Sequence, residues 1–274
     1  MRPPAPTPGT VARQFRSAYA AHRAAEGRGA GGDAELLALP YLRSGPVAGQ
    51  WSVRARTFDR FVRAVIAPLT RGLGRPLAVL DLGAGNGWLC HRLCRDGHRT
   101  VALDLRNDDV DGLGAAAAYE RYLDPMFGRV VASFEALPLA SRTFDVAAFN
   151  AALHYATDLR AALSEAARVV RRGGQLAILD SPFYRRRSDG EAMVAAKRRD
   201  GARTFGAQAD RLLSLPFIEY LTPDGLRESS LDLGLAWRRH RVRYPLRYEL
   251  RPMVAAARGR RTPSRFDLWT AAVG

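Results

Sequence analysis

The sequence predicts an α/β protein with a doubly wound, seven-stranded and mostly parallel sheet that carries helices on both faces. The first observation is an alternation, between residues 77 and 181, of short apolar runs with segments of helical periodicity. The second is a glycine-rich turn, GAGNG, directly after the first apolar run. The third is composition, because a chain of 274 residues, 47% of them hydrophobic, can form a large core. Such an alternation is typical of parallel βαβ units.

Five short apolar runs are the predicted strands of the parallel part. They cover residues 77–82, 99–105, 129–133, 144–150 and 175–180. The segments between them have apolar residues at helical spacing, which predicts helices over 87–96, 112–123 and 158–171. Gly173 and Gly174 are expected to end the last of these helices, because glycine is favoured just past a helix.

The flanks of this region are predicted to be helical. Residues 1–9 are proline-rich and are expected to form a disordered tail. A helix is predicted over 10–26, where GRGAGG at 27–32 interrupts it, and another over 53–71. We therefore expect a helical cover at residues 10–74 in front of a main domain at residues 75–274.

The chain becomes less regular after the fifth predicted strand. Helices are expected over 188–200 and 223–233, followed by two closing strands at 235–244 and 265–272. The segment 183–234 is longer than an ordinary crossover, which predicts a cap insertion above the sheet.

Charge and cysteine content narrow the classes of protein. The net charge is +15, and residues 238–261 hold nine arginines against Glu249 alone. Such a block is typical of a solvated basic face, or of a surface that binds nucleic acid, an anionic membrane or a phosphorylated substrate. No apolar run is long enough to predict a membrane span. Cys90 and Cys94 are too few for a disulfide framework or a metal site, so we expect no metal and a cytoplasmic location.

The segment VLDLGAGNGWL, residues 79–89, raises the question of what its alternate glycines accommodate. A dinucleotide fingerprint requires G-x-G-x-x-G, but here the third glycine comes one position early, at Gly87. A P-loop requires a terminal G-K-[ST], which this chain lacks. Glycine at the carboxyl end of a parallel strand lets a ligand approach the backbone closely.

The remaining pattern, D-x-G-x-G-x-G, resembles motif I of the class I S-adenosylmethionine (SAM)-dependent methyltransferases. Three further segments match that family in the expected order, namely VALDL at 101–105, FEALPLASRTFDVAAFNAALHY at 134–155 and LSEAARVVRRGGQLAILD at 163–180. The resemblance covers about residues 77–181. It implies SAM as the cofactor.

The resemblance also assigns roles to residues of the cofactor site. Asp81 would order the glycine loop or approach the amino group of SAM. Asp104 would bind both ribose hydroxyls, since charge-assisted hydrogen bonds are strong. The other implied cofactor residues are Gly83, Ala84, Gly85, Gly87, Leu105, Ser133, Phe134 and Asn150. Ser133 departs from the family, in which an aspartate often bonds the adenine amino group.

The methyl acceptor is less well defined by the sequence. His154 and Tyr155 follow the fourth strand, and His154 is a candidate general base. The strand ends N-A-A-L-H-Y rather than N/D-P-P-Y/F, which argues against methylation of planar exocyclic amines. The residues predicted to contact the acceptor are Tyr41, Trp51, Phe183, Tyr184 and Arg185, the last of them in a run of three arginines suited to an anionic group.

The sequence therefore predicts a SAM-dependent methyltransferase that acts on a small or medium-sized metabolite, with an anionic acceptor among the candidates. The transfer would be to oxygen, nitrogen or an activated carbon. Two alternatives remain open. One is an RNA methyltransferase that uses the basic block at 238–261, and the other is a non-catalytic SAM-binding protein.

Overall fold

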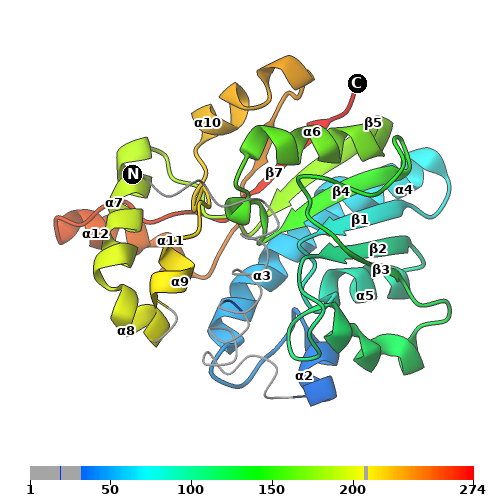
Figure 1. Ribbon diagram of the computed structural model, residues 1–274, viewed down its shortest axis with the longest axis horizontal. Helices are drawn as coiled ribbons and strands as arrows, with labels where there is room; N and C mark the ends of the chain where they lie inside the picture. The colour runs from blue at the N-terminus through cyan, green and yellow to red at the C-terminus, as the bar shows by residue number, and fades with distance from the viewer. Residues whose placement is uncertain (1–18, 20–31, 207–208) are drawn as a thin grey trace, which may run out of the picture.

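The computed structural model describes Tyr19, residues 32–206 and residues 209–274. It contains a seven-stranded sheet in the order β3-β2-β1-β4-β5-β7-β6 (Figure 1). The strands β1 to β5 run parallel, and β7 is antiparallel to both β5 and β6. The order reverses direction between β1 and β4, so the predicted doubly wound, mostly parallel sheet is confirmed.

The strands lie close to their predicted positions. Their bounds are β1 Ala78–Leu82, β2 Arg99–Asp104, β3 Gly128–Val131, β4 Phe144–Asn150, β5 Val170–Leu179, β6 Arg238–His240 and β7 Leu268–Ala272. Every residue of β1 and β4 is buried. Strands that are covered on both faces consist of near-continuous apolar residues, which is why the pattern along the sequence was readable.

Helices cover both faces of the sheet. Those at the N-terminal side and within the parallel part are α2 Gly32–Ala38, α3 Ala48–Phe61, the π-helical turn η1 Val62–Ile66, α4 Ala67–Leu73, α5 Trp88–Arg95, the 3₁₀ segment η2 Leu113–Tyr122, the 3₁₀ turn η3 Leu153–Tyr155 and α6 Leu159–Val169. One apolar cluster joins α3 and α5 to the sheet through residues such as Phe61 and Leu89. A second cluster packs α6 on the opposite face through Leu163 and Phe149.

The segment between β5 and β6 is helical. It contains α7 Arg187–Arg199, α8 Gly201–Phe205, α9 Ala209–Leu213, α10 Pro223–Glu228 and the 3₁₀ turn η5 Leu231–Leu233, and two further helices, α11 Leu246–Glu249 and α12 Arg251–Ala257, lie between β6 and β7. Thr222 caps α10 by accepting a hydrogen bond from the Gly225 amide at 3.0 Å. In Figure 1 these helices lie mostly on the left, beside the carboxyl ends of the parallel strands.

Three sequence-based expectations need correction or fall outside the described residues. Gly173 and Gly174 do not end a helix, because α6 stops at Val169 and the pair lies inside β5, at a shift in its register with β4. Gly173 has φ +78°, and a side chain on Gly174 would contact the Asp145 carbonyl. The helices at 246–257 were not predicted. The predicted tail at 1–9 and the helix at 10–26 lie outside the described residues, apart from Tyr19.

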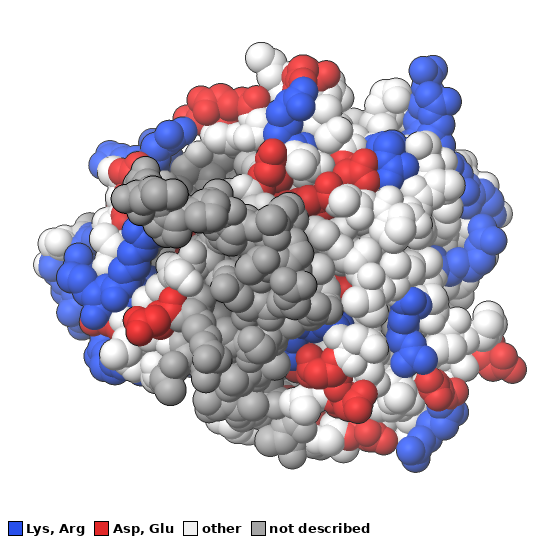
Figure 2. All heavy atoms as spheres, in the orientation of Figure 1, with Lys and Arg blue, Asp and Glu red and all other residues white. Residues whose placement is uncertain are grey.

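Two surface properties complete the fold. Among the described residues, no helix is long and apolar enough to cross a membrane. Arginines of the basic block are partly engaged within the fold, because Arg239 pairs with Asp267 at 2.5 Å and Arg241 with Glu249 at 3.4 Å. Figure 2 shows other basic side chains gathered at the left edge, where α7 and α12 lie in Figure 1.

Candidate functional site

A cavity of about 800 Å³ opens at the carboxyl ends of β1, β2, β4 and β5. This volume lies in the upper part of the range found for small-molecule sites, which is roughly 300–1,000 Å³. The helix α3 forms one wall through Trp51 and Arg54, and the loop from Gly83 to Asn86 forms another. The cavity therefore occupies the place where doubly wound sheets bind ligands, beside the reversal of strand order.

The three glycines of the loop meet different neighbours. All three have positive φ, at +76° for Gly83, +55° for Gly85 and +75° for Gly87. A Cβ on Gly83 would lie 2.3 Å from that of Ala152, and one on Gly87 would lie 2.8 Å from the Phe127 ring. Gly83 and Gly85 line the cavity, together with Ala84. Gly87 is instead the residue before α5, where it lets the helix pack on Phe127.

Gly83→Ala is expected to destabilise the protein by at least about 1–2 kcal/mol, the usual cost of left-handed backbone for a residue with a side chain. The clash with Ala152 adds to this cost. The double variant Gly83→Ala/Ala152→Gly relieves the clash and retains the backbone strain, so it should recover only part of the loss. Chemical denaturation of the three proteins measures both parts, and full recovery in the double variant would show that the backbone is unstrained.

Asp104 is held in a fixed orientation at the end of β2. Its Oδ2 accepts a hydrogen bond from the Gly85 amide and its Oδ1 accepts one from the Arg106 amide, both at 2.8 Å. Burial raises the pKa of Asp104, and these two amides oppose the rise. Each carboxylate oxygen has a second lone pair, so the group can still accept two hydrogen bonds from a ligand in the cavity.

Asp81 is fully buried below the glycine loop and does not itself line the cavity. Neither of its carboxylate oxygens has a hydrogen-bond partner among the described residues, so its side chain does not bond the loop backbone. Burial, followed by repulsion from Asp104, raises the pKa of Asp81 to about 8, and Arg54 opposes the rise. A buried carboxyl of this kind is suited to a positive charge placed nearby.

The other residues of the predicted cofactor site also line the cavity. They are Leu105, Ser133, Phe134 and Asn150. The Ser133 hydroxyl accepts a hydrogen bond from the Glu135 amide at 3.2 Å. This bond orients the hydroxyl at the start of the loop that follows β3. The Phe134 ring packs edge-on against Phe149, with centroids 5.6 Å apart. This side of the cavity is thus apolar around Leu105 and Phe134 and polar around Asp104.

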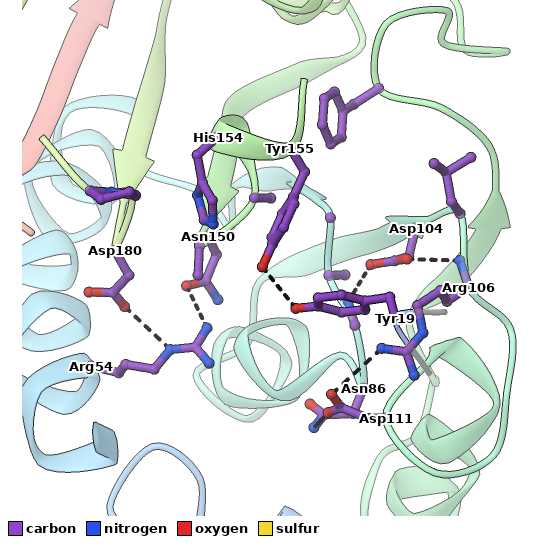
Figure 3. A pocket seen from close by; sticks show the side chains of 18 of the residues that line it. Tyr19, Arg54, Asn86, Asp104, Arg106, Asp111, Asn150, His154, Tyr155 and Asp180 are labelled. Atoms are coloured by element: carbon purple, nitrogen blue, oxygen red, sulfur yellow. Dashed lines mark hydrogen bonds and ion pairs between the residues drawn. The ribbon is translucent and has the colours of Figure 1, made fainter. Parts of the chain in front are cut away.

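A second polar group lies on the opposite side of the cavity, at the ends of β4 and β5 (Figure 3). Arg54 reaches from α3 between Asn150 and Asp180. Its Nη2 donates to Asn150 Oδ1 at 3.3 Å, and its Nε lies 3.5 Å from Asp180 Oδ2. The guanidinium also stacks over Trp51, 4.5 Å from the ring centroid. Burial raises the pKa of Asp180 to about 6, while Arg54 and the hydroxyl of Thr57 lower it.

The two predicted catalytic residues face the same cavity. His154 Nδ1 lies 3.4 Å from Ser181 Oγ, and the hydroxyl of Tyr155 is hydrogen-bonded to that of Tyr19 at 3.2 Å. In Figure 3, His154 and Tyr155 stand between the Asp180 side and the Asp104 side. Tyr19 also packs under Arg106, 5.2 Å from its guanidinium carbon, and so closes the Asp104 side.

The predicted acceptor-binding residues are divided between the cavity and other places. Trp51 lines the cavity, whereas Tyr41, Phe183, Tyr184 and Arg185 are not among its lining residues. Tyr41 is half-exposed and donates to Asp59 at 2.7 Å. Phe183 is buried against Trp269, Tyr184 packs on Tyr220, and Arg185 is exposed. The chain after β5 turns these three side chains away, and Pro182 takes the lining position.

The sequence analysis missed Arg54 and Asp180. Asp180 is the last residue of a predicted strand, and a polar residue at the carboxyl end of a parallel strand is a usable signal of a site. Its φ of +51° is rare for a residue with a side chain, and such backbone is frequent at functional sites. Arg54 gave no local signal, since its role depends on where α3 crosses the sheet. Two further polar residues of the cavity lining, the carboxylate of Asp111 and the amide of Asn86, were also missed.

Comparison with known proteins identifies the domain. Residues 80–178 match a family model described as a methyltransferase domain. The chain is 33% identical over 148 residues to a malonyl-[acyl-carrier protein] O-methyltransferase of Erwinia pyrifoliae, an alignment that covers 53% of this chain and 50% of the relative. It is 36% identical over 106 residues to a ubiquinone/menaquinone biosynthesis C-methyltransferase of Rhizobium johnstonii, covering 37% of this chain and 40% of the relative. The chain thus spans about half or less of the length of these relatives.

Solved structures share the fold across nearly the whole chain. The 1,6-didemethyltoxoflavin-N1-methyltransferase of Burkholderia thailandensis has a TM-score of 0.57 and 19% identity, covering 100% of this chain and 93% of its own. The [4+2]-cyclase SpnF has a TM-score of 0.62 and 19% identity, covering 99% and 98%. At this identity the likeness shows the fold alone. The segment at residues 80–178 is thus a methyltransferase domain, and the chain as a whole has the fold of these solved structures.

Proposed function

We propose that the protein transfers a methyl group from SAM to a small or medium-sized metabolite. The observation that carries the proposal is the division of one cavity into two polar ends. Asp104 and the glycine loop form one end, on β2 and β1, and Arg54, Asn150 and Asp180 form the other, beside β4 and β5. Such an arrangement suits a site for two molecules, the cofactor and the acceptor.

The cofactor end fits SAM on three points. Asp104 is oriented by two amides and retains lone pairs for ribose hydroxyls. Gly85 lines the cavity and has no side chain, so a ligand can approach its backbone. Asp81 is a buried carboxyl without a hydrogen-bond partner among the described residues, which suits the positive charge of the ligand's methionine end. Leu105, Ser133 and Phe134 would border the adenine.

SAM, when bound, supplies a methyl group on a sulfonium that is already activated as a leaving group. The protein therefore has mainly to align the acceptor and to exclude water. Trp51 and Arg54 on α3 and Tyr19 and Tyr155 close the cavity walls. A basic group is needed only for an acceptor that loses a proton, and His154 and Tyr155 are both within the cavity for such a role.

The acceptor is proposed to be a compact neutral molecule rather than an anion. The exposed run of Arg185, Arg186 and Arg187 is not part of the cavity lining. Within the cavity, Arg54 is already paired with Asp180, so an anionic acceptor would place a second negative charge beside that carboxyl. The curated relatives are named for malonyl-[acyl-carrier protein] and for ubiquinone/menaquinone biosynthesis. The acceptor of this chain is proposed from the chemistry of its own cavity.

The proposal is tested first by calorimetric titration of the protein with SAM and with S-adenosylhomocysteine. Micromolar binding is expected for the wild type and a loss of at least tenfold for Asp104→Asn, since the variant loses two charge-assisted hydrogen bonds. Asp96→Asn is the matched control, because Asp96 is exposed at the end of α5 and lies outside the cavity. Absence of binding to the wild type would refute the proposal.

A further inference from the structure

Two buried polar groups of the acceptor end are not used by the proposed cofactor. The side chain of Asp180 is 5% exposed, and apart from the 3.5 Å ion pair of Oδ2 with Arg54 its oxygens have no hydrogen-bond partner among the described residues. The buried hydroxyl of Tyr248 on α11 lacks a hydrogen-bond partner within the same part of the chain. Both residues line the cavity. A buried carboxylate and a buried phenol left in this state are costly unless a ligand satisfies them.

The sheet fixes where these groups lie relative to the cofactor. The strands β2, β1, β4 and β5 are consecutive neighbours, and their carboxyl ends carry Asp104, the glycine loop, Asn150 and Asp180 in that order. Neighbouring strands are roughly 4.8 Å apart, so Asp180 is about 14 Å along the sheet edge from Asp104. Figure 3 shows Asp180 and Asp104 at opposite sides of the cavity. Asp180 is thus placed for the acceptor.

Aromatic side chains from several elements line the cavity. They are Trp51, Tyr155, Phe217, Tyr248 and Phe266, and Tyr248 with Phe266 lies on the Asp180 side. Tyr155 packs edge-on to Phe217, with centroids 5.6 Å apart, and Tyr248 packs on Phe266 at 6.4 Å. Aromatic walls favour flat apolar ligands, because rings stack or meet edge to face.

We propose that the acceptor is a planar aromatic or heteroaromatic molecule with an acidic O–H or ring N–H, and that Asp180 is the catalytic base that receives this proton. The inference rests on the proposed function and names its substrate class. The O–H or N–H bond breaks, its electron pair forms the new bond to the methyl carbon, and the proton goes to a carboxylate oxygen of Asp180. The electron pair of the broken carbon–sulfur bond stays on sulfur, so charge and atoms balance.

The charges that face Asp180 make this role consistent near neutral pH. Arg54 on α3 stabilises the carboxylate form, and burial opposes it, which leaves the pKa near 6. The tyrosines of the neighbouring segment stay neutral, because burial and the Asp180 charge raise the pKa of Tyr248 to about 12 and raise that of Tyr244 further. Asp180 is therefore mostly ionised at pH 7 and can accept a proton.

His154 is the competing base within the cavity. Its Nδ1 lies 3.4 Å from Ser181 Oγ, and its ring packs on Tyr155 at 4.2 Å between centroids. The sequence analysis favoured His154, because the position after the fourth strand faces the acceptor side. Asp180 is preferred here because it is buried, because Arg54 sets its charge state and because its oxygens make no hydrogen bond among the described residues beyond the 3.5 Å ion pair of Oδ2 with Arg54. His154→Gln is accordingly the variant that tests the competing base beside Asp180→Asn.

The test uses 4-nitrophenol, whose phenol and phenolate forms absorb at different wavelengths. With the protein saturated with S-adenosylhomocysteine at pH 7.5, the wild type is expected to bind the neutral phenol, which lowers phenolate absorbance. Asp180→Asn leaves Arg54 without its carboxylate partner, so the bound probe should shift to phenolate. Asp96→Asn changes an exposed carboxylate outside the cavity and should behave as the wild type, whereas Tyr248→Phe should weaken binding several-fold.

The outcomes separate this inference from the proposed function. Absence of probe binding to the wild type, or the same absorbance change in Asp180→Asn, would overturn the role of Asp180 even if SAM binds normally. Failure of SAM and S-adenosylhomocysteine to bind would instead remove the proposed function. An acceptor can be identified from a panel of hydroxylated and N-heterocyclic aromatics. With that acceptor, Asp180→Asn should lower kcat/KM by roughly 10²–10⁴-fold. The variant should also lose the acidic limb that the pH profile of kcat/KM shows near pH 6 in the wild type. SAM affinity should stay within about threefold of the wild type. Loss of that limb in His154→Gln and its retention in Asp180→Asn would overturn the inference.

Discussion

Asp81→Asn is expected to stabilise the ligand-free protein by a few kcal/mol above pH 8 and to change its stability little near pH 4. Burial raises the pKa of Asp81 to about 8 in the folded protein, whereas the unfolded chain has the ordinary value near 4. Between these values the folded state holds a proton that the unfolded state has lost. The free energy of unfolding of the wild type therefore falls by up to about 1.4 kcal/mol per pH unit across this window.

Asparagine has no proton to lose, so the variant should not show this fall. Urea denaturation of both proteins at several values between pH 4 and pH 9 measures the difference. Asp96→Asn removes an exposed carboxylate and serves as the control. A stability difference between wild type and Asp81→Asn that does not change with pH would contradict the raised pKa.

The same carboxyl links cofactor binding to pH. A ligand with a sulfonium and an ammonium would favour the ionised form of Asp81, so SAM binding at pH 7 should release a proton. Calorimetry in two buffers of different ionisation enthalpy detects the release. Asp81→Asn should release no proton and should bind SAM at least tenfold more weakly at pH 8.5, with a smaller loss at pH 6. Equal affinity of the two proteins at pH 8.5 would show that Asp81 does not face the ligand's charge.

The sequence revealed the cofactor end of the site much better than the acceptor end. The glycine loop and Asp104 follow two strands whose apolar runs are unmistakable, and the positions are fixed by local chain order. Such features depend on the turn directly after a strand, so they can be predicted from a short stretch of sequence. The parallel strands were correct for the same reason, because β1 and β4 are buried along their whole length.

The acceptor end depends on contacts between distant segments. Arg54 comes from a helix before the sheet, Asp180 directly follows β5, and Tyr248 and Phe266 come from the C-terminal region. No local pattern fixes which face of α3 crosses the strand ends. Phe183 and Tyr184 follow β5 as predicted, yet their aromatic partners Trp269 and Tyr220 hold them outside the cavity lining. Sequence position near a strand end was therefore insufficient to assign an acceptor contact.

Arg54→Met is expected to affect both ends of the cavity at once. The positive charge of Arg54 lowers the pKa of both Asp81 and Asp180. Removing that charge should therefore raise both pKa values. The guanidinium lies over the rings of Trp51 and Trp88, and methionine keeps an apolar chain beside them while removing the charge. At pH 7, each unit by which the pKa of Asp81 rises should weaken SAM binding about tenfold.

On the acceptor side, the same variant should move the acidic limb of kcat/KM upward from pH 6, because Asp180 would lose its proton at a higher pH. Arg54→Lys keeps the positive charge and should restore most of the SAM affinity and most of the limb, although lysine cannot reproduce the contacts of the planar guanidinium. Proton release measured by calorimetry and the pH–rate profile report the two carboxyls separately. A change in one readout without the other would show that Arg54 acts on a single carboxyl, and the cavity would then work as two independent charge sites rather than one coupled by a shared guanidinium.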